Sequence, residues 1–194
     1  ALLLAAVVGS GIMGERLAQG NMAVALLANA IATGTGLYVL IVTLKPVSGA
    51  HFNPVVSGVS AWERRISRYQ AGVYMLAQVG GAFAGVAAAH AMFGLPIIQI
   101  SAHARPTLGE GLGELIATFG LMLVISLLLR SRAEAIPTAV AAFITSAYWF
   151  TSSTSFANPA VTFARAMTDT FAGISPQSVP LFVGERVLGT LNFA

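Results

Sequence analysis

Long apolar segments, separated by short polar connections, dominate the chain. The pattern predicts helices over residues 1–13, 22–44, 69–93, 108–129 and 137–149, and a last helix that begins near residue 179. A helix needs about 20 apolar residues to cross a bilayer, so the longer segments are typical of membrane-spanning helices. The first and the last segments are shorter, and we expect both to be truncated parts of spanning helices.

Two Asn-Pro pairs, Asn53-Pro54 and Asn158-Pro159, interrupt this pattern. Asn is a favourable cap and Pro suits the first turn of a helix, so each pair predicts a helix start. The two Asn residues are 158 − 53 = 105 positions apart, a little over half the chain. This spacing indicates an internal duplication.

The apolar runs after the two pairs, residues 54–63 and 159–170, are too short to cross a bilayer. A short capped helix between spanning helices suggests a half-helix whose positive dipole end lies near the middle of the membrane. We therefore expect two half-helices that enter from opposite faces and meet at their Asn residues.

Composition supports a membrane protein and excludes several other classes. Apolar residues make up 56% of the chain and charged residues only 9%, against about 25% charged in a soluble domain. The absence of Cys excludes disulfides, thiol nucleophiles and Cys-based metal sites. With few acids outside loops, we expect no enzyme activity, no metal and no cofactor.

Most of the basic residues gather in two connections, after the second and after the fourth predicted spanning helix, on one predicted side of the membrane. The net charge of +3 could suggest nucleic acid, but clustering in short loops is what membrane topology requires, so we expect no nucleic-acid partner. The cytoplasmic side is then marked by Lys45, Arg64, Arg65, Arg68, Arg130 and Arg132. The first half-helix would enter from the cytoplasm and the second from outside.

Three motifs carry a resemblance to a known family. They are Ser48-Gly49-Ala50-His51-Phe52-Asn53, Tyr74-x-x-Ala77-Gln78-x-x-Gly81-Ala82-x-x-Gly85 and Glu114-x-x-x-Thr118. Together with the paired Asn-Pro boxes, they resemble the aquaporin and aquaglyceroporin (major intrinsic protein) family over nearly the whole chain.

The resemblance implies an all-α membrane protein with six transmembrane helices and two re-entrant half-helices in an inverted internal repeat. It implies a single channel domain over residues 1–194, with repeats 1–103 and 104–194. It also implies a multi-pass protein of the cell membrane, surrounded by lipid, that forms a homotetramer with one pore in each subunit.

The pore would be centred on the boxes Asn53-Pro54-Val55 and Asn158-Pro159-Ala160. Asn side chains and helix N-termini offer donors and positive potential, which pass neutral polar molecules and disfavour cations. Residues 48–52 and 151–157 would turn backbone carbonyls into the path as acceptors. Val55 stands where the family's first box has Ala, and we interpret it as a packing change.

The outer constriction is where the chain departs from the family's water channels, which usually carry Arg after the second box. Here that position holds Val161, and the offsets from the Asn residues place Thr33, Ser146 and Ser155 beside it. None is large or charged, so we predict a wider pore. The expected solutes are glycerol-like polyols and neutral metalloid hydroxides such as arsenite, with water also passing. Val at this place resembles metalloid-conducting aquaglyceroporins linked to bacterial arsenic resistance.

Three further residues have open or implied roles. By its box position His51 lines the cytoplasmic pore mouth, or else it hydrogen-bonds within its loop. The resemblance implies that Glu114 braces the second re-entrant loop through backbone hydrogen bonds; an acid within a spanning helix is usually partnered. Arg165 lies one helical turn beyond Val161, and if it reached the pore it would counter the wide filter.

Three rival interpretations were weighed. Gly9-x-Gly11-x-x-Gly14 matches a dinucleotide-binding pattern, but after Glu15 the next acid is Glu63, too far for that motif. A non-conducting membrane scaffold would keep the fold and give no flux. An orthodox water channel would exclude glycerol.

Overall fold

A computed structural model describes residues 1–184, and every regular element in that range is helical. The helices are α1 (Leu2–Leu17), α2 (Met22–Ser48), α3 (Pro54–Trp62), α4 (Arg68–Met92), α5 (Leu108–Ser131), α6 (Ile136–Phe150) and α7 (Pro159–Arg165), with short 3-10 turns η1 (Ala133–Ala135) and η2 (Pro176–Ser178). Residues 179–184 begin a further helix, and the rest of the predicted last helix lies outside the described residues.

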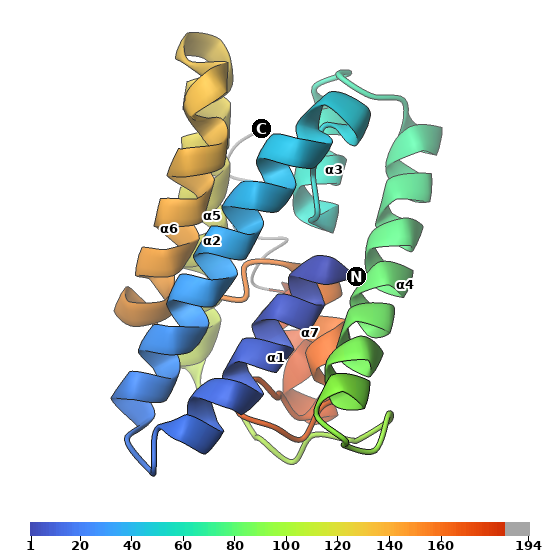
Figure 1. Cartoon of the computed structure of the whole chain (residues 1–194). Helices are drawn as coiled ribbons and strands as arrows, with labels where there is room; N and C mark the ends of the chain where they lie inside the picture. The colour runs from blue at the N-terminus through green and yellow to red at the C-terminus, as the bar shows by residue number, and fades with distance from the viewer. Residues whose placement is uncertain (185–194) are drawn as a thin grey trace.

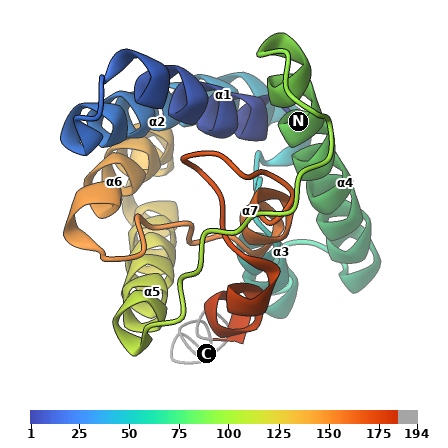
Figure 2. The ribbon, with the colours of Figure 1, turned by 90° about the horizontal axis from the view of Figure 1, so that it is seen from below.

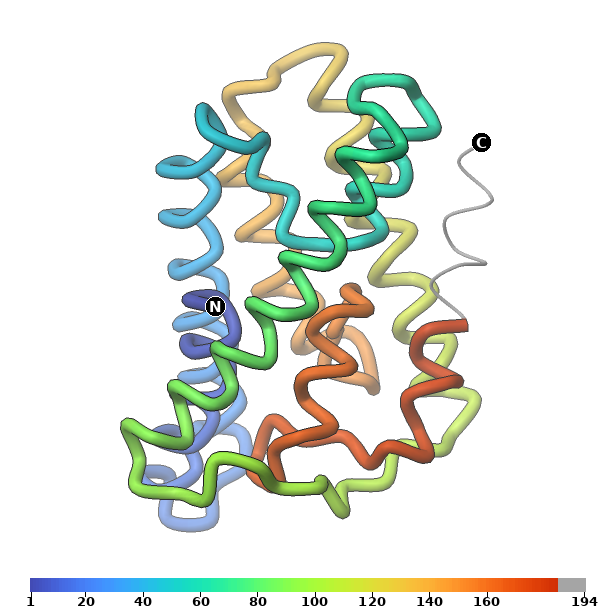
Figure 3. The backbone as a smooth tube through the Cα atoms, turned by 90° about the vertical axis from the view of Figure 1, so that its right-hand side faces the viewer, coloured from blue at the N-terminus to red at the C-terminus, as the bar shows by residue number. Residues whose placement is uncertain are grey.

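The two short helices α3 and α7 start near the middle of the molecule and run to opposite ends (Figures 1 and 3). The longer helices surround them, as the view along the bundle shows (Figure 2). From α5 onward the chain repeats the order of α1 to α3 with each direction reversed (Figure 1). This is the antiparallel arrangement of half-helices that the paired boxes predict.

Three of these helices are long and apolar enough to cross a membrane: α2, α4 and α5, with 27, 25 and 24 residues. Large apolar side chains on their outer faces are exposed, among them Val39, Leu76 and Leu127. Outward apolar faces of this kind are what lipid contact requires. Since α1 and α6 have only 16 and 15 residues, the prediction of six complete spans stays a prediction.

The basic residues gather at one end of the bundle. Lys45 lies in the last turn of α2, Arg64 and Arg65 follow α3, and Arg130 lies in the last turn of α5. These helix ends share one end of the molecule (Figure 1). By the positive-inside rule this end faces the cytoplasm, and the 93–107 connection crosses the outer end.

The predicted end of the second helix at Lys45-Pro46 is wrong. Helix α2 continues to Ser48 and stops at Gly49, whose φ of 74° is left-handed and whose N–H donates to the Lys45 carbonyl. Glycine adopts this cap without steric cost, so the glycine ends the helix and the proline does not. Ser48 is therefore helical and does not belong to the predicted irregular segment.

The second half-helix is also shorter than predicted, since α7 ends at Arg165 instead of near residue 170. The Arg165 carbonyl accepts a hydrogen bond from the Ile174 N–H, 3.3 Å away, in place of a further helical turn. The Thr168 hydroxyl lies 2.7 Å from Nε2 of the buried His90 on α4. These long-range contacts hold residues 166–174 as a return loop.

Close packing between α2 and α6 depends on Gly34. A Cβ at this position would overlap Oγ1 of Thr145 and lie 3.2 Å from the Ala141 carbonyl oxygen. Small residues allow helices to approach closely in lipid, where van der Waals packing drives association. Gly34 therefore sets the distance between two helices that line the site described below.

We predict that Gly34→Ala lowers stability, because overpacking costs about 1–3 kcal/mol. Gly72→Ala on α4 is the matched control, since nothing lies within 4 Å of a Cβ there and the gain in helix propensity is the same. The measurement is the midpoint of thermal unfolding in detergent. Equal midpoints for the two variants would contradict the role given to Gly34.

Candidate functional site

The two Asn residues bind each other's loops at the centre of the molecule. Asn53 Nδ2 donates to the Ala157 carbonyl and Asn158 Nδ2 donates to the Phe52 carbonyl, each at 2.7 Å. The Oδ1 atom of each Asn caps its own half-helix by accepting backbone N–H groups. Each Asn side chain thus connects its own half-helix to the loop that precedes the other Asn. An Asn NH2 group has two N–H donors, so one N–H of each side chain remains for a solute.

The backbone before the two Asn residues has the same unusual conformation in both loops. Ala50 and Phe52 have φ of 50° and 51°, and Ser155 and Ala157 have φ of 45° and 44°. In both loops these are the third and the first positions before the Asn. Left-handed non-glycine residues cost free energy and gather at functional sites. The matching pairs show that the two loops approach their Asn residues with the same backbone conformation.

Glu114 of α5 holds the second loop. Its two carboxylate oxygens accept the Phe156 and Ala157 N–H groups at 2.8 and 2.9 Å, and the side chain is fully buried. This is the backbone contact that the sequence predicts for Glu114. It satisfies two N–H groups that the left-handed turns leave without secondary-structure partners.

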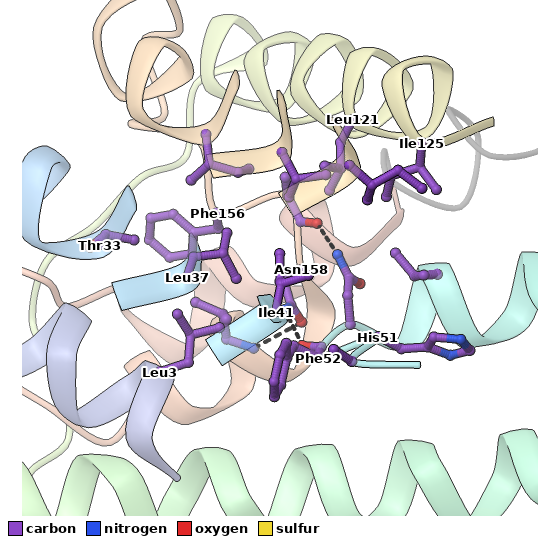
Figure 4. A pocket seen from close by; sticks show the side chains of 18 of the residues that line it. Leu3, Thr33, Leu37, Ile41, His51, Phe52, Leu121, Ile125, Phe156 and Asn158 are labelled. Atoms are coloured by element: carbon purple, nitrogen blue, oxygen red, sulfur yellow. Dashed lines mark hydrogen bonds between the residues drawn. The ribbon is translucent and has the colours of Figure 1, made fainter. Parts of the chain in front are cut away.

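A cavity of about 350 Å³ passes along the two loops, from Lys45 and Arg65 at the basic end to Arg165 at the outer end. Asn53 and Asn158 both line it, and Figure 4 shows Asn158 among the lining side chains. The volume is far above the roughly 10–15 Å³ that one water needs. The cavity therefore has room for small molecules between the two ends of the bundle.

The wall opposite the loops is apolar. It consists of aliphatic side chains from five helices: Leu3 and Val7 of α1, Leu37 and Ile41 of α2, Val56 of α3, Leu121 and Ile125 of α5, and Val140 and Ile144 of α6. The loop side offers the amide donors and the non-helical backbone. A molecule in this cavity meets hydrogen-bonding groups on one side and hydrocarbon on the other.

Three of the four predicted filter residues line the outer part of this cavity: Thr33, Ser155 and Val161. All three are buried. Among the described residues the Ser155 hydroxyl has no hydrogen-bond partner, although the side chain is only 2% exposed. This hydroxyl is thus available to a solute.

The structure does not place the fourth predicted filter residue, Ser146, at the cavity. The Ser146 side chain is exposed, and its hydroxyl donates to the Phe143 carbonyl at 2.8 Å. Helix α6 turns Val140, Ile144 and Tyr148 toward the cavity at a spacing of four. A residue two positions from Ile144 therefore lies on the other face of the helix.

Tyr148 is the cavity-lining residue of α6 that sequence reasoning missed. It is 3% exposed, and its hydroxyl donates to Thr33 Oγ1 at 3.3 Å, so the phenol crosses from α6 to α2. The apolar spacing of four along residues 136–148 was the signal that could have found it. The wall of this part of the cavity therefore includes an aromatic ring.

Two arginines flank one aromatic ring at the outer end. The guanidinium carbons of Arg165 and Arg105 lie 3.4 and 5.3 Å from the centre of the Phe156 ring. Arg105 also donates to the Ser153 and Gly173 carbonyls at 3.1 and 3.3 Å. Burial lowers the pKa of the Arg105 guanidinium, and the carboxylates of Glu110 and Glu114 oppose that shift. Phe156 and Arg165 line the cavity, so Arg165 does reach it.

His51 takes part in both arrangements that the sequence left open. It lines the cavity near its basic end, and its Nδ1 lies 3.1 Å from the Ser57 hydroxyl. Gln78 of α4 donates to the same hydroxyl at 2.9 Å. Val55 does not line the cavity. Its backbone N–H donates to Asn53 Oδ1, which caps α3.

A polar path bounded by two facing half-helices inside a bundle of apolar helices defines a membrane channel. The comparisons agree, and the chain belongs to the major intrinsic protein family, whose pattern matches residues 1–150. It is a multi-pass protein of the plasma membrane.

Named relatives support this membership. The aquaglyceroporin AqpS of Rhizobium meliloti (strain 1021) is 51% identical over 190 residues, which cover 98% of this chain and 81% of that protein. Rat (Rattus norvegicus) aquaporin-2 is 33% identical over 118 residues, 58% of this chain and 44% of that protein. The probable aquaporin PIP2-8 of Oryza sativa subsp. japonica is 36% identical over 93 residues, 48% of this chain and 33% of that protein.

We predict that Glu114→Gln weakens the second loop. A Gln offers one acceptor and presents an NH2 group to the other backbone N–H, and a buried unsatisfied donor costs about 1–3 kcal/mol. The expected result is a lower thermal midpoint and slower solute flux in vesicles. Glu134→Gln, an exposed carboxylate in η1, is the control and leaves both values unchanged.

Proposed function

We propose that the protein is a passive channel with a wide outer filter for small uncharged polyhydroxyl solutes. These are glycerol-like polyols and neutral metalloid hydroxides such as arsenous acid, with water passing as well. The observation that carries the proposal is Val161, which lines the outer cavity with a short apolar side chain. Arg165 lines the cavity too, but its guanidinium is stacked on the Phe156 ring and its Nε–H is bound to the Ala172 carbonyl.

The cavity matches the chemistry of such solutes. A polyol has hydroxyl groups along one side of a hydrocarbon backbone, and the cavity has hydrogen-bonding groups on one side and aliphatic side chains on the other. The donors are the amides of Asn53 and Asn158, and the hydroxyls of Thr33 and Ser155 are donors and acceptors. A solute that sheds its water at this point finds replacements on the loop side.

Neutral metalloid hydroxides present the same outer groups as a polyol, since they are small molecules covered with hydroxyls. The filter side chains that would meet them are short and uncharged at three positions, Thr33, Ser155 and Val161. The relative that matches nearly the whole chain is named an aquaglyceroporin, which favours the wider class of solute over water alone.

Further features of the protein follow from family membership and belong to the same proposal. We expect one channel domain built from repeats 1–103 and 104–194. We also expect a homotetramer with a pore in each subunit, held through exposed apolar helix faces. In this proposal the contact between subunits involves neither the two Asn-Pro boxes nor the filter residues.

The central test concerns Val161→Arg. In vesicles that contain the purified protein, we expect the parent to pass glycerol and arsenite, and the variant to lower both fluxes by about tenfold while water flux remains. The reason is that a guanidinium narrows the filter and adds fixed donors. Stopped-flow light scattering under sucrose, glycerol and arsenite gradients measures all three fluxes.

Val161→Ile is the matched control, because it keeps the site apolar and uncharged. Water flux without glycerol flux in the parent would make the protein a water-selective channel despite Val161. If correctly folded protein passed no solute at all, the proposed channel function would be wrong and the interpretation as a non-conducting membrane scaffold would stand.

A second prediction concerns Tyr148. Replacing it by Ala removes the ring that crosses to Thr33, so we expect a several-fold higher flux of five-carbon polyols relative to glycerol. Ser146→Ala is the control, because Ser146 lies on the other face of α6 and its loss leaves the ratio unchanged. A change caused by Ser146→Ala and not by Tyr148→Ala would overturn this assignment of the filter.

A further inference from the structure

We propose that the basic mouth of the cavity is a binding site for phosphate monoesters of small polyols. Lys45 and Arg65 hold the phosphate group, the polyol part extends into the cavity, and the bound ester closes the path from the cytoplasmic side. The inference deepens the proposed function and rests on it, because the ester is a charged derivative of the neutral polyols that the channel is proposed to conduct.

The first step is that cationic and hydroxyl side chains line the cavity at the basic end of the bundle (Figure 1). Lys45 lies in the last turn of α2, Ser60 lies in α3, and Arg65 lies in the connection between α3 and α4. The mouth therefore offers a ligand an ammonium group, a hydroxyl and a guanidinium from three separate segments. This set of donors suits a phosphate group.

The second step is that most of these donors are not used within the protein. Lys45 Nζ donates to the Ala133 carbonyl, which holds the ammonium group in place and leaves two of its three N–H donors. Arg65 Nε lies 3.2 Å from Glu63 Oε2, and the four N–H groups on the other two guanidinium nitrogens remain. The two cations can therefore bind several oxygens of one phosphate group.

The third step is that the acids at this end do not balance the positive charge. Glu63 pairs with Arg65, but the two side chains are 28% and 36% exposed, and exposed pairs are weak. No Asp or Glu lines the described part of the cavity. Six basic residues and two acids of the described chain lie at this end, a net formal charge of +4: Lys45, Arg64, Arg65, Arg68, Arg130 and Arg132, with Glu63 and Glu134. An anion is therefore attracted to the mouth.

Membrane topology explains why basic residues lie on this side, but it does not explain why two of them line the cavity. The positive-inside rule requires only charge in the connections, and Arg64, Arg68, Arg130 and Arg132 meet it without lining the cavity. A phosphate monoester carries about −1.5 to −2 charges at pH 7 and three acceptor oxygens. Its charge and its acceptors both match the cavity mouth at Lys45 and Arg65.

The cavity beyond the two cations suits the polyol part of the ester. It continues past His51 to Asn53, with hydrogen-bonding groups on the loop side and aliphatic side chains opposite. The phosphate group cannot follow, because a charge that leaves water for this partly apolar space loses more solvation than the loop restores. The ester therefore stays at the mouth and blocks it, whereas inorganic phosphate has only the two cations to bind.

The experiment measures glycerol entry by stopped-flow light scattering in phosphatidylcholine vesicles that contain the whole chain. Glycerol 3-phosphate is present on both sides of the membrane, so the orientation of the protein does not matter. We expect the ester to slow glycerol entry several-fold, and inorganic phosphate to need a higher concentration for the same effect. In the double variant Lys45→Gln with Arg65→Gln, the ester no longer slows entry.

The matched control is the double variant Arg130→Gln with Arg132→Gln. It removes the same charge from the same end, at residues that do not line the cavity, so the ester slows entry as it does in the parent. Loss of the effect in this control, or an equal effect of sodium chloride at the same ionic strength, would overturn the site. If the first double variant does not fold, Lys45→Gln and Arg65→Gln are tested singly, and each raises the ester concentration needed.

A binding measurement tests the site without flux. Glycerol 3-phosphate raises the thermal unfolding midpoint of the parent in detergent, because a ligand that binds only the folded state stabilises it. The midpoint of the double variant Lys45→Gln with Arg65→Gln does not change. If glycerol passes and the ester neither slows it nor raises the midpoint, the site is overturned and the channel remains. If no neutral solute passes, the proposed function fails, and the midpoint shift still decides the site.

Two further arms identify the source of the phosphate group. Equal potency of inorganic phosphate and glycerol 3-phosphate would overturn the role of the polyol part. Vesicles that also contain phosphatidylglycerol test a lipid headgroup as the occupant. Slower glycerol entry in these vesicles without the ester, relieved in the double variant Lys45→Gln with Arg65→Gln, would assign the site to lipid and overturn the ester.

Discussion

The reciprocal hydrogen bonds between Asn53 and Asn158 are the constraint on which the rest of the structure depends. Each side chain caps its own half-helix and binds the carbonyl that precedes the other Asn, at 2.7 Å in both directions. The two half-helices therefore cannot shift independently. Because each amide has a second N–H, the same pair that closes the structure also offers donors to a solute. The same two residues thus join the two loops and line the cavity.

Contacts from α5 and from the 93–107 connection support the second loop. Glu114 accepts two of its N–H groups, and Arg105 donates to the carbonyls of Ser153 and Gly173. These buried charged groups are costly unless their hydrogen bonds are made. Their contacts hold Ser155 and Ala157 in left-handed conformations that short side chains adopt only under constraint. The strained loop that carries Ser155 is thus held in place by α5 and the 93–107 connection.

The predictions from sequence succeeded where the signal was local. The helix starts at Pro54 and Pro159, the long apolar helices and the basic end all have their causes within a few residues of chain. The predictions were wrong where a distant contact or one glycine decided the outcome. Helix α2 continues to Ser48 because Gly49 caps it. Helix α7 ends at Arg165, where the Ile174 N–H binds the Arg165 carbonyl and Thr168 contacts His90. The residue expected on α6 was misplaced because counting back from Asn158 crosses the irregular segment 151–157 and does not give the rotation of α6 about its axis.

The sequence by itself determined the class of protein and the two half-helices that run to opposite ends of the bundle. Apolar length, caps and charge act locally, so they can be read without coordinates. Only the tertiary structure decided which side chains face the cavity. That depends on how each helix is rotated about its axis and how far a side chain reaches across to another element. Tyr148 therefore replaces Ser146, and Arg165 lies beside Phe156 at the outer end of the path.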